Sequence, residues 1–159
     1  MLFRSAYRGD DGLVSDFREV TPTFWASPQI GLDDVREAKA RGFTLIVNNR
    51  PEGESDDQVP GDAIAAEAAA CGLAYQAIPI THAGFGEEQV AAMTTALAEA
   101  QGPVLAYCRS GTRSTFLWSL AQAAAGADPD TIASQAAGAG YDVGSIRPLM
   151  DMLFARRES

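Results

Sequence analysis

Residues 107–115, which read YCRSGTRST, combine a thiol, two arginines, a glycine and four aliphatic hydroxyls. An apolar run at 103–106 precedes them, and a stretch rich in alanine, leucine and aromatic residues follows at 112–125. This pattern predicts a turn that leads from a strand into a buried helix. Such a turn presents several backbone N–H groups and the positive end of the helix dipole to one point, which favours an oxyanion such as phosphate, sulfate or a thiosulfonate.

The residue types in this turn suit an anion site that carries a nucleophile. Gly111 allows conformations in which the amides curl inward, and Arg113 can offer a two-pronged fork to a tetrahedral oxyanion. An ordinary thiol, with a pKa of about 8.5, is only slightly ionised at neutral pH, whereas helix N-termini and nearby cations favour the thiolate. We therefore expect Cys108 to react. The alternative is a buried strand cysteine beside arginines that hold a helix end. The residues expected to bind the anion are Arg109, Ser110, Gly111, Thr112 and Arg113.

The composition of the chain excludes several other functions. Its 159 residues suit one domain, and 21 acidic against 12 basic residues give a net charge of -9, which argues against nucleic acids and anionic membranes as partners. No apolar stretch is long enough to span a membrane, and the N-terminal segment lacks the apolar core of a secretory signal, so we expect a cytoplasmic protein. Two cysteines and one histidine argue against a disulfide framework and a zinc site. We expect no metal and no cofactor; the oligomeric state is left open.

The pattern along the chain indicates a fold with alternating strands and helices. Residues 1–15 are interpreted as a loose N-terminal tail and residues 16–159 as a single domain. Strands are expected near 17–25, as a hairpin or edge strand broken by a proline, and at 43–47, 73–80 and 103–107. Helices are expected near 31–41, 61–71, 87–101, 112–125, 129–137 and 143–156. This order predicts an α/β fold with a mostly parallel central sheet flanked by helices on both faces.

Parallel strands bring the loops that follow them to one edge of the sheet. Loops 48–60, 81–87 and 108–113 should therefore meet around Cys108. In the first loop Arg50 could add to the positive field, and in the second His82, which titrates near neutrality, could serve as a general acid. Other acid candidates are Asp56, Asp57, Glu87 and Glu88, although the two glutamates also suit the first turn of a helix.

The segment from about 17 to 126 resembles the phosphatase-like domain of the beta-lactamase hydrolase-like proteins, which is similar in fold to dual-specificity protein tyrosine phosphatases. The matching stretches are SPQIGLDDVREAKARGFTLIVNNRPEGE, GLAYQAIPI and PVLAYCRSGTRS. The resemblance implies a cysteine-dependent hydrolase with Cys108 as nucleophile, Arg113 as anion clamp and Ser114 as a supporting hydroxyl. Its substrate would be a phosphoester or another small oxyanion ester, cleaved through a covalent phosphocysteine. The resemblance does not imply β-lactam hydrolysis.

The turn departs from the usual phosphatase signature in two ways. That signature has a histidine before the cysteine and five residues between cysteine and arginine, whereas Tyr107 precedes Cys108 here and four residues intervene. The shorter loop resembles that of single-domain rhodaneses, so a sulfurtransferase that carries a persulfide on Cys108 is an alternative. In addition, no aspartate lies between Thr81 and Gly102 to act as the acid. A third alternative is a non-catalytic domain that binds an anion or a partner.

Overall fold

The computed structural model describes residues 15–158. It contains a five-stranded sheet whose strands are β1 (Arg18–Thr21), β2 (Phe24–Ser27), β3 (Leu45–Asn48), β4 (Ala74–Ala77) and β5 (Val104–Tyr107). The helices are α1 (Leu32–Ala40), α2 (Gly61–Cys71), α3 (Glu87–Glu99), α4 (Thr112–Ala124), α5 (Pro129–Gly138) and α6 (Arg147–Glu158), with a 3₁₀ turn, η1 (Gly144–Ile146), before α6. The predicted order of strands and helices is confirmed, although β4 is shorter than the expected strand at 73–80. Most of the predicted N-terminal tail lies outside the described residues.

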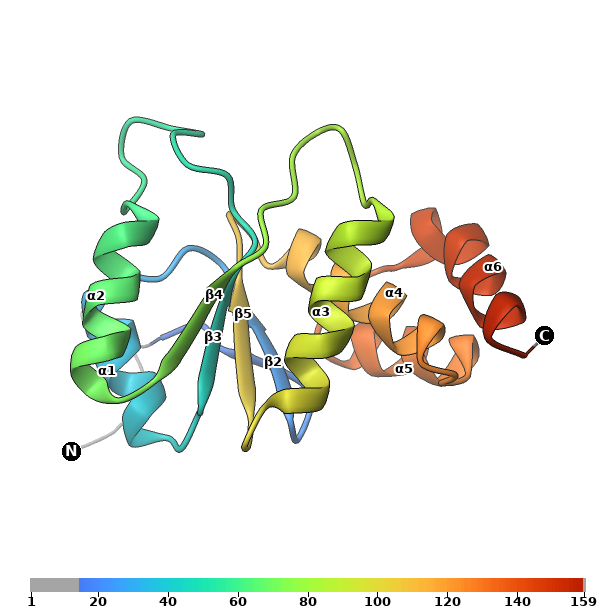
Figure 1. Ribbon diagram of the computed structural model, residues 1–159, viewed down its shortest axis with the longest axis horizontal. Coiled ribbons are helices and arrows are strands. Elements are labelled where there is room, and N and C mark those ends of the chain that lie inside the picture. The colour runs from blue at the N-terminus through green and yellow to red at the C-terminus, as the bar shows by residue number, and fades with distance from the viewer. Residues whose placement is uncertain (1–14, 159) are drawn as a thin grey trace.

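The sheet has the order β1-β2-β5-β3-β4, in which only the β1–β2 pair is antiparallel. The expected hairpin near 17–25 is therefore present, with Pro22 between its strands, and β1 forms one edge of the sheet. Figure 1 shows α1 and α2 on one face of the sheet and α3 to α6 on the other. The predicted mostly parallel sheet with helices on both faces is confirmed.

Strand β5 is the middle strand of the sheet, and both of its faces are buried. Val104 and Ala106 belong to the hydrophobic cluster under α3 and α4, whereas Leu105 and Tyr107 belong to the cluster under α1 and α2. This alternation explains why the strand reads as a continuous apolar run, as strands covered on both faces do. It also places Cys108 at the carboxyl end of the middle strand.

The loops after β3, β4 and β5 meet at one edge of the sheet, as predicted. In Figure 1 the loops after β3 and β4 rise together above that edge, and α4 starts below the loop after β4. None of the helices within residues 15–158 is long and apolar enough to cross a membrane.

Candidate active site

Cys108 follows the last residue of β5 and lies in the short connection to α4. Its backbone N–H donates to the Ser27 carbonyl at 3.3 Å, which ties the connection to β2. Its Sγ accepts the Gly111 N–H at 3.1 Å. Gly111 is the N-cap residue of α4 and has a φ of +92°, in the left-handed region that favours glycine. Cys108 has no exposed surface, which also fits the alternative of a buried cysteine, and the turn places it at the N-terminus of α4.

Arg113 lies in the first turn of α4 and connects all three loops. Its Nη1 donates to Glu54 Oε2 at 2.7 Å and to the Ile80 carbonyl at 3.0 Å, and its Nη2 donates to Glu54 Oε1 at 2.9 Å. The hydrogen bonds to Glu54 raise the pKa of Arg113, and its interaction with Cys108 adds to this shift. A guanidinium has five N–H donors. Nε–H and the second Nη2–H have no oxygen acceptor within residues 15–158, and these two hydrogens lie along one edge of the group.

Glu54 holds two arginines in this structure. Besides Arg113, it accepts a hydrogen bond from Arg50 Nε at 2.9 Å. The hydrogen bonds from Arg113, followed by those from Arg50, lower the pKa of Glu54 from its ordinary 4.5 to about 2, although partial burial opposes the shift. Glu54 is therefore ionised at neutral pH. It orients the Arg113 guanidinium, and it carries no proton that it could donate at neutral pH.

Arg50 is buried, and its side chain is bonded to protein groups. Its Nη1 donates to Gln29 Oε1 at 2.8 Å and its Nη2 to Ser55 Oγ at 3.1 Å, in addition to the bond to Glu54. Because each nitrogen of the guanidinium donates to a protein group, Arg50 organises the loop after β3. Its direct contribution to an anion site stays a prediction.

Ser114 is buried and points to the loop after β3. Its hydroxyl donates to Asn49 Oδ1 at 2.7 Å, and Asn49 in turn donates from Nδ2 to the Ile78 carbonyl and from its backbone N–H to the Tyr107 carbonyl. Asn49 therefore joins β5, α4 and the chain after β4. The hydroxyl hydrogen of Ser114 is used in this bond, so the support of the sulfur by Ser114 stays a prediction.

The remaining residues of the turn lie at the surface or near it. Arg109 and Ser110 are exposed and Thr112 is partly buried. The Ser110 hydroxyl donates to Thr112 Oγ1 at 3.0 Å, and the Arg109 carbonyl accepts the Gln29 N–H at 3.3 Å. These contacts shape the turn, and the Arg109 side chain is exposed.

None of the acid candidates makes a hydrogen bond with Cys108 or Arg113 in the described part of the chain. His82 is exposed in the loop after β4, close in sequence to Ile80, whose carbonyl holds Arg113. Asp57 accepts from Ser55 Oγ at 2.6 Å, and this hydrogen bond lowers the pKa of Asp57, so that carboxyl also favours the ionised form. Asp56, Glu87 and Glu88 are exposed. Within residues 15–158 no cluster of three histidine, cysteine or acidic side chains could hold a metal ion.

Sequence reasoning missed two residues that the structure places in the site. Glu54 stands in a long acidic loop, in which the sequence shows no difference between it and the neighbouring carboxylates. Asn49 lies at the start of the loop 48–60, and its side chain is fully buried and bonded on both sides. A polar residue directly after an apolar strand, at the edge where loops converge, was the available signal.

Comparisons with known proteins agree with this geometry. A family model for the phosphatase-like domain of beta-lactamase hydrolase-like proteins matches residues 16–125. The beta-lactamase hydrolase-like protein of Xylella fastidiosa strain Temecula1 is 36% identical over 96 residues, which are 60% of this chain and 22% of that protein. The corresponding protein of Agrobacterium fabrum strain C58 is 37% identical over 90 residues, or 57% of this chain and 21% of that protein. The match therefore spans about a fifth of these relatives.

Solved structures show the same fold. A candidate phosphatase from Neisseria meningitidis Z2491 has a TM-score of 0.76 and 28% identity, covering 87% of this chain and 98% of that one. Tk-PTP in its active form has a TM-score of 0.67 and 15% identity, covering 89% and 97%. P. aeruginosa TpbA has a TM-score of 0.62 and 16% identity, covering 91% and 92%. At these lower identities the likeness shows the fold alone.

The family and these structures support a phosphatase-like hydrolase and lend no support to the sulfurtransferase alternative. The matched segment covers more than half of the chain and includes both Cys108 and Arg113. The chain belongs to the phosphatase-like domain family of the beta-lactamase hydrolase-like proteins.

Proposed function

We propose that this domain is a cysteine-dependent phosphatase that hydrolyses phosphate monoesters, or a similar small oxyanion ester, through Cys108. The observation that carries the proposal is the hydrogen bond from the Gly111 N–H to Cys108 Sγ at the N-terminus of α4. Arg113 stands beside this pair with one donor edge available. The family of the chain and the complex of a TpbA variant with phosphotyrosine support a phosphoester as the substrate class.

The reaction would proceed in two displacements at phosphorus. In the first, the Cys108 thiolate forms an S–P bond as the P–O bond to the leaving group breaks, and the electron pair departs with the leaving oxygen. In the second, water attacks phosphorus, the S–P bond breaks, its electron pair returns to Cys108, and inorganic phosphate leaves. In both steps the N–H groups of residues 109–112 and the free edge of Arg113 would stabilise the negative charge on the phosphoryl oxygens.

The leaving oxygen needs a proton unless it is already a weak base. A positioned donor contributes about 10²–10⁴ in rate. Glu54 is excluded because its pKa of about 2 leaves it ionised at neutral pH. His82, in the loop whose Ile80 carbonyl holds Arg113, is the donor that we propose.

The nucleophile is tested with an aryl phosphate. Cys108→Ser should reduce the rate by about 10³-fold or more, because the hydroxyl is a far weaker nucleophile at neutral pH. Cys71→Ser is the matched control, since Cys71 ends α2, contacts Glu67 and lies outside the site. Mass spectrometry of the wild type after acid quenching should show one phosphoryl group on Cys108.

Three results would contradict this proposal. Activity that survives Cys108→Ser would remove the nucleophile. Transfer of sulfur from thiosulfate to cyanide, with a persulfide on Cys108 and no phosphatase activity, would show that the protein is a sulfurtransferase and not a phosphatase. Sulfate binding without turnover of any ester would indicate a non-catalytic anion-binding domain.

The same assay tests the proton donor. His82→Ala should slow the hydrolysis of an alkyl phosphate, whose leaving oxygen is strongly basic, much more than that of a nitrophenyl phosphate. An equal effect on both esters would remove His82 as the acid while leaving Cys108 as the nucleophile.

A further inference from the structure

The peptide unit between Ser110 and Gly111 lies between the nucleophile and a tyrosine hydroxyl. On one side the Gly111 N–H donates to Cys108 Sγ at 3.1 Å. On the other side the Ser110 carbonyl accepts a hydrogen bond from Tyr141 Oη at 3.3 Å. A trans peptide is planar, so its N–H and C=O point in opposite directions, and residues 15–158 contain no cis peptide. A bond that holds the carbonyl toward Tyr141 therefore holds the N–H toward Cys108.

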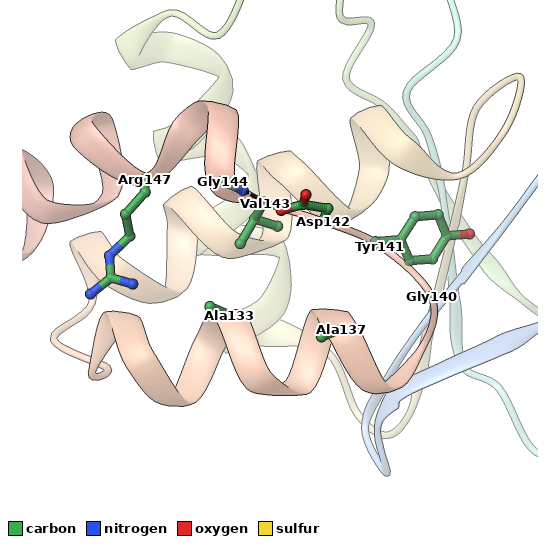
Figure 2. Close-up of a pocket in the computed structure, with 8 residues that line it drawn as sticks. All are labelled: Ala133, Ala137, Gly140, Tyr141, Asp142, Val143, Gly144 and Arg147. Atoms are coloured by element: carbon green, nitrogen blue, oxygen red, sulfur yellow. Dashed lines mark hydrogen bonds between the residues drawn. The ribbon is translucent and has the colours of Figure 1, made fainter.

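Tyr141 comes from the part of the chain that follows the family match at residue 125. It stands after α5, where its backbone N–H donates to the Ala136 carbonyl at 3.0 Å, and only 6% of its surface is exposed. Figure 2 shows it at one end of a cavity of about 430 Å³ that Ala133 and Arg147 also line. In Figure 2 the hydroxyl of Tyr141 points away from Ala133 and Arg147. It reaches the carbonyl of Ser110, in the turn between β5 and α4.

The surroundings of Tyr141 keep its hydroxyl in place and neutral. Burial raises the pKa of Tyr141, and the interaction with Cys108 raises it further, whereas Arg18 opposes the shift from a position 5.5 Å from the ring centroid. Asp16, which pairs with Arg18, is the other charged group that acts on the ring. The hydroxyl is therefore available as a donor at neutral pH.

The Tyr141 hydroxyl occupies the space that a side chain at position 111 would fill. A Cβ at that position would lie 2.2 Å from Tyr141 Oη. The left-handed conformation of Gly111 and the position of Tyr141 thus fit together, and both act on the same peptide unit. Hydrogen bonds in such a chain polarise one another, so the donor at the carbonyl strengthens the N–H as a donor to sulfur.

We propose that Tyr141 is a positioning residue for the nucleophile: through the Ser110–Gly111 peptide it keeps the Gly111 N–H directed at Cys108 Sγ and so favours the thiolate. Its importance for turnover rests on the proposed function. Its effect on Cys108 does not, because the reactivity of the thiol can be measured without any substrate.

The test is the alkylation rate of Cys108 by iodoacetamide across a pH series, followed on its own peptide by mass spectrometry. Tyr141→Phe removes the hydroxyl and keeps the ring. It should move the midpoint of the profile upward by about 0.5 to 1 pH unit, which is about a 3- to 10-fold loss of thiolate below the midpoint. Tyr75→Phe is the matched control, because its hydroxyl accepts from Asn48 and interacts with the Tyr107 side chain, which packs under α1 and α2, and not with the Ser110–Gly111 peptide. That control should leave the midpoint unchanged.

A second variant keeps the fold and acts in the opposite direction. With 3-fluorotyrosine at position 141 the hydroxyl is more acidic and donates more strongly, so the midpoint should move downward. The proposal is overturned if Tyr141→Phe lowers thermal stability without moving the midpoint, or if the fluorinated and Phe variants move it in the same direction. A shifted midpoint in a protein that hydrolyses no phosphoester would remove the proposed function and leave the positioning role intact.

Discussion

The two connections that meet at the candidate site, β5 to α4 and β3 to α2, differ in how they hold their shape. The first spans only residues 108–111 and relies on backbone groups, above all the peptide between Ser110 and Gly111. The second spans residues 49–60 and relies on charged side chains, with Glu54 between Arg50 and Arg113. The shape of the short connection therefore depends on how its backbone packs and bonds, whereas the shape of the long connection depends on the ionised Glu54 carboxylate.

This difference assigns complementary tasks to the two connections. Backbone N–H groups keep their charge distribution at any pH, so the backbone donors of the short turn do not themselves titrate. The long loop supplies a carboxylate that holds the clamp arginine by one edge and leaves the other edge open. The stability of variants in the short connection should therefore depend on the volume of the added side chain, and that of variants in the long loop on charge and pH.

The largest effect on stability is expected from Gly111→Ala. A side chain at φ +92° costs about 1–2 kcal/mol, and the collision with Tyr141 Oη adds about 1–3 kcal/mol, so unfolding in urea should show a loss of about 2–5 kcal/mol. Gly42→Ala is the matched control, since Gly42 has a φ of +93° and no atom within 4 Å of the added Cβ. Gly42→Ala should lose only about 1–2 kcal/mol, which is the cost of a side chain at a positive φ. Equal losses in the two variants would show that the fit against Tyr141 contributes nothing.

A smaller effect is expected from Glu54→Gln in the long loop. The amide keeps the shape but removes the charge shared by two arginines, one of them buried, so we expect a loss of about 1–3 kcal/mol. Glu37→Gln, which breaks the exposed pair with Arg41, should cost about 0.5 kcal/mol or less. Phosphatase activity should fall in Glu54→Gln and not in Glu37→Gln. Similar losses of stability in both variants would mean that the loop is held by its backbone.

The smallest effect is a pH dependence that only the long loop should show. The pKa of Glu54 is lower in the folded protein, at about 2, than its ordinary 4.5. The unfolded chain therefore binds the proton first, and the stabilisation by Glu54 is complete above pH 4.5 and lost as the pH falls toward 2. Urea unfolding across this range should show the wild type and Glu54→Gln converging in stability. The Gly111→Ala difference should stay constant, and a parallel pH profile for wild type and Glu54→Gln would contradict the assigned ion pair.

The residues of the turn could be predicted because they are local in sequence. An apolar run, a cysteine, a glycine and an arginine within a few positions specify a strand, a tight turn and a helix N-terminus, and each of these has a known geometry. The hydrogen bond from the Gly111 N–H to Cys108 follows from that geometry. The edge at which the loops meet could also be predicted, because parallel strands all end on the same side of a sheet.

The partners of the turn could not be predicted, because they come from distant positions. Glu54 is 59 residues from Arg113 and Tyr141 is 31 residues from Ser110. Which carboxylate in an acidic loop reaches an arginine depends on the path of that loop, and no local pattern encodes this path. The sequence by itself therefore determined the α/β fold and the candidates for the nucleophile and the anion-binding residues. Only the tertiary structure decided which side chains hold Arg113 and orient the Ser110–Gly111 peptide, because those contacts form when segments far apart in the chain pack together.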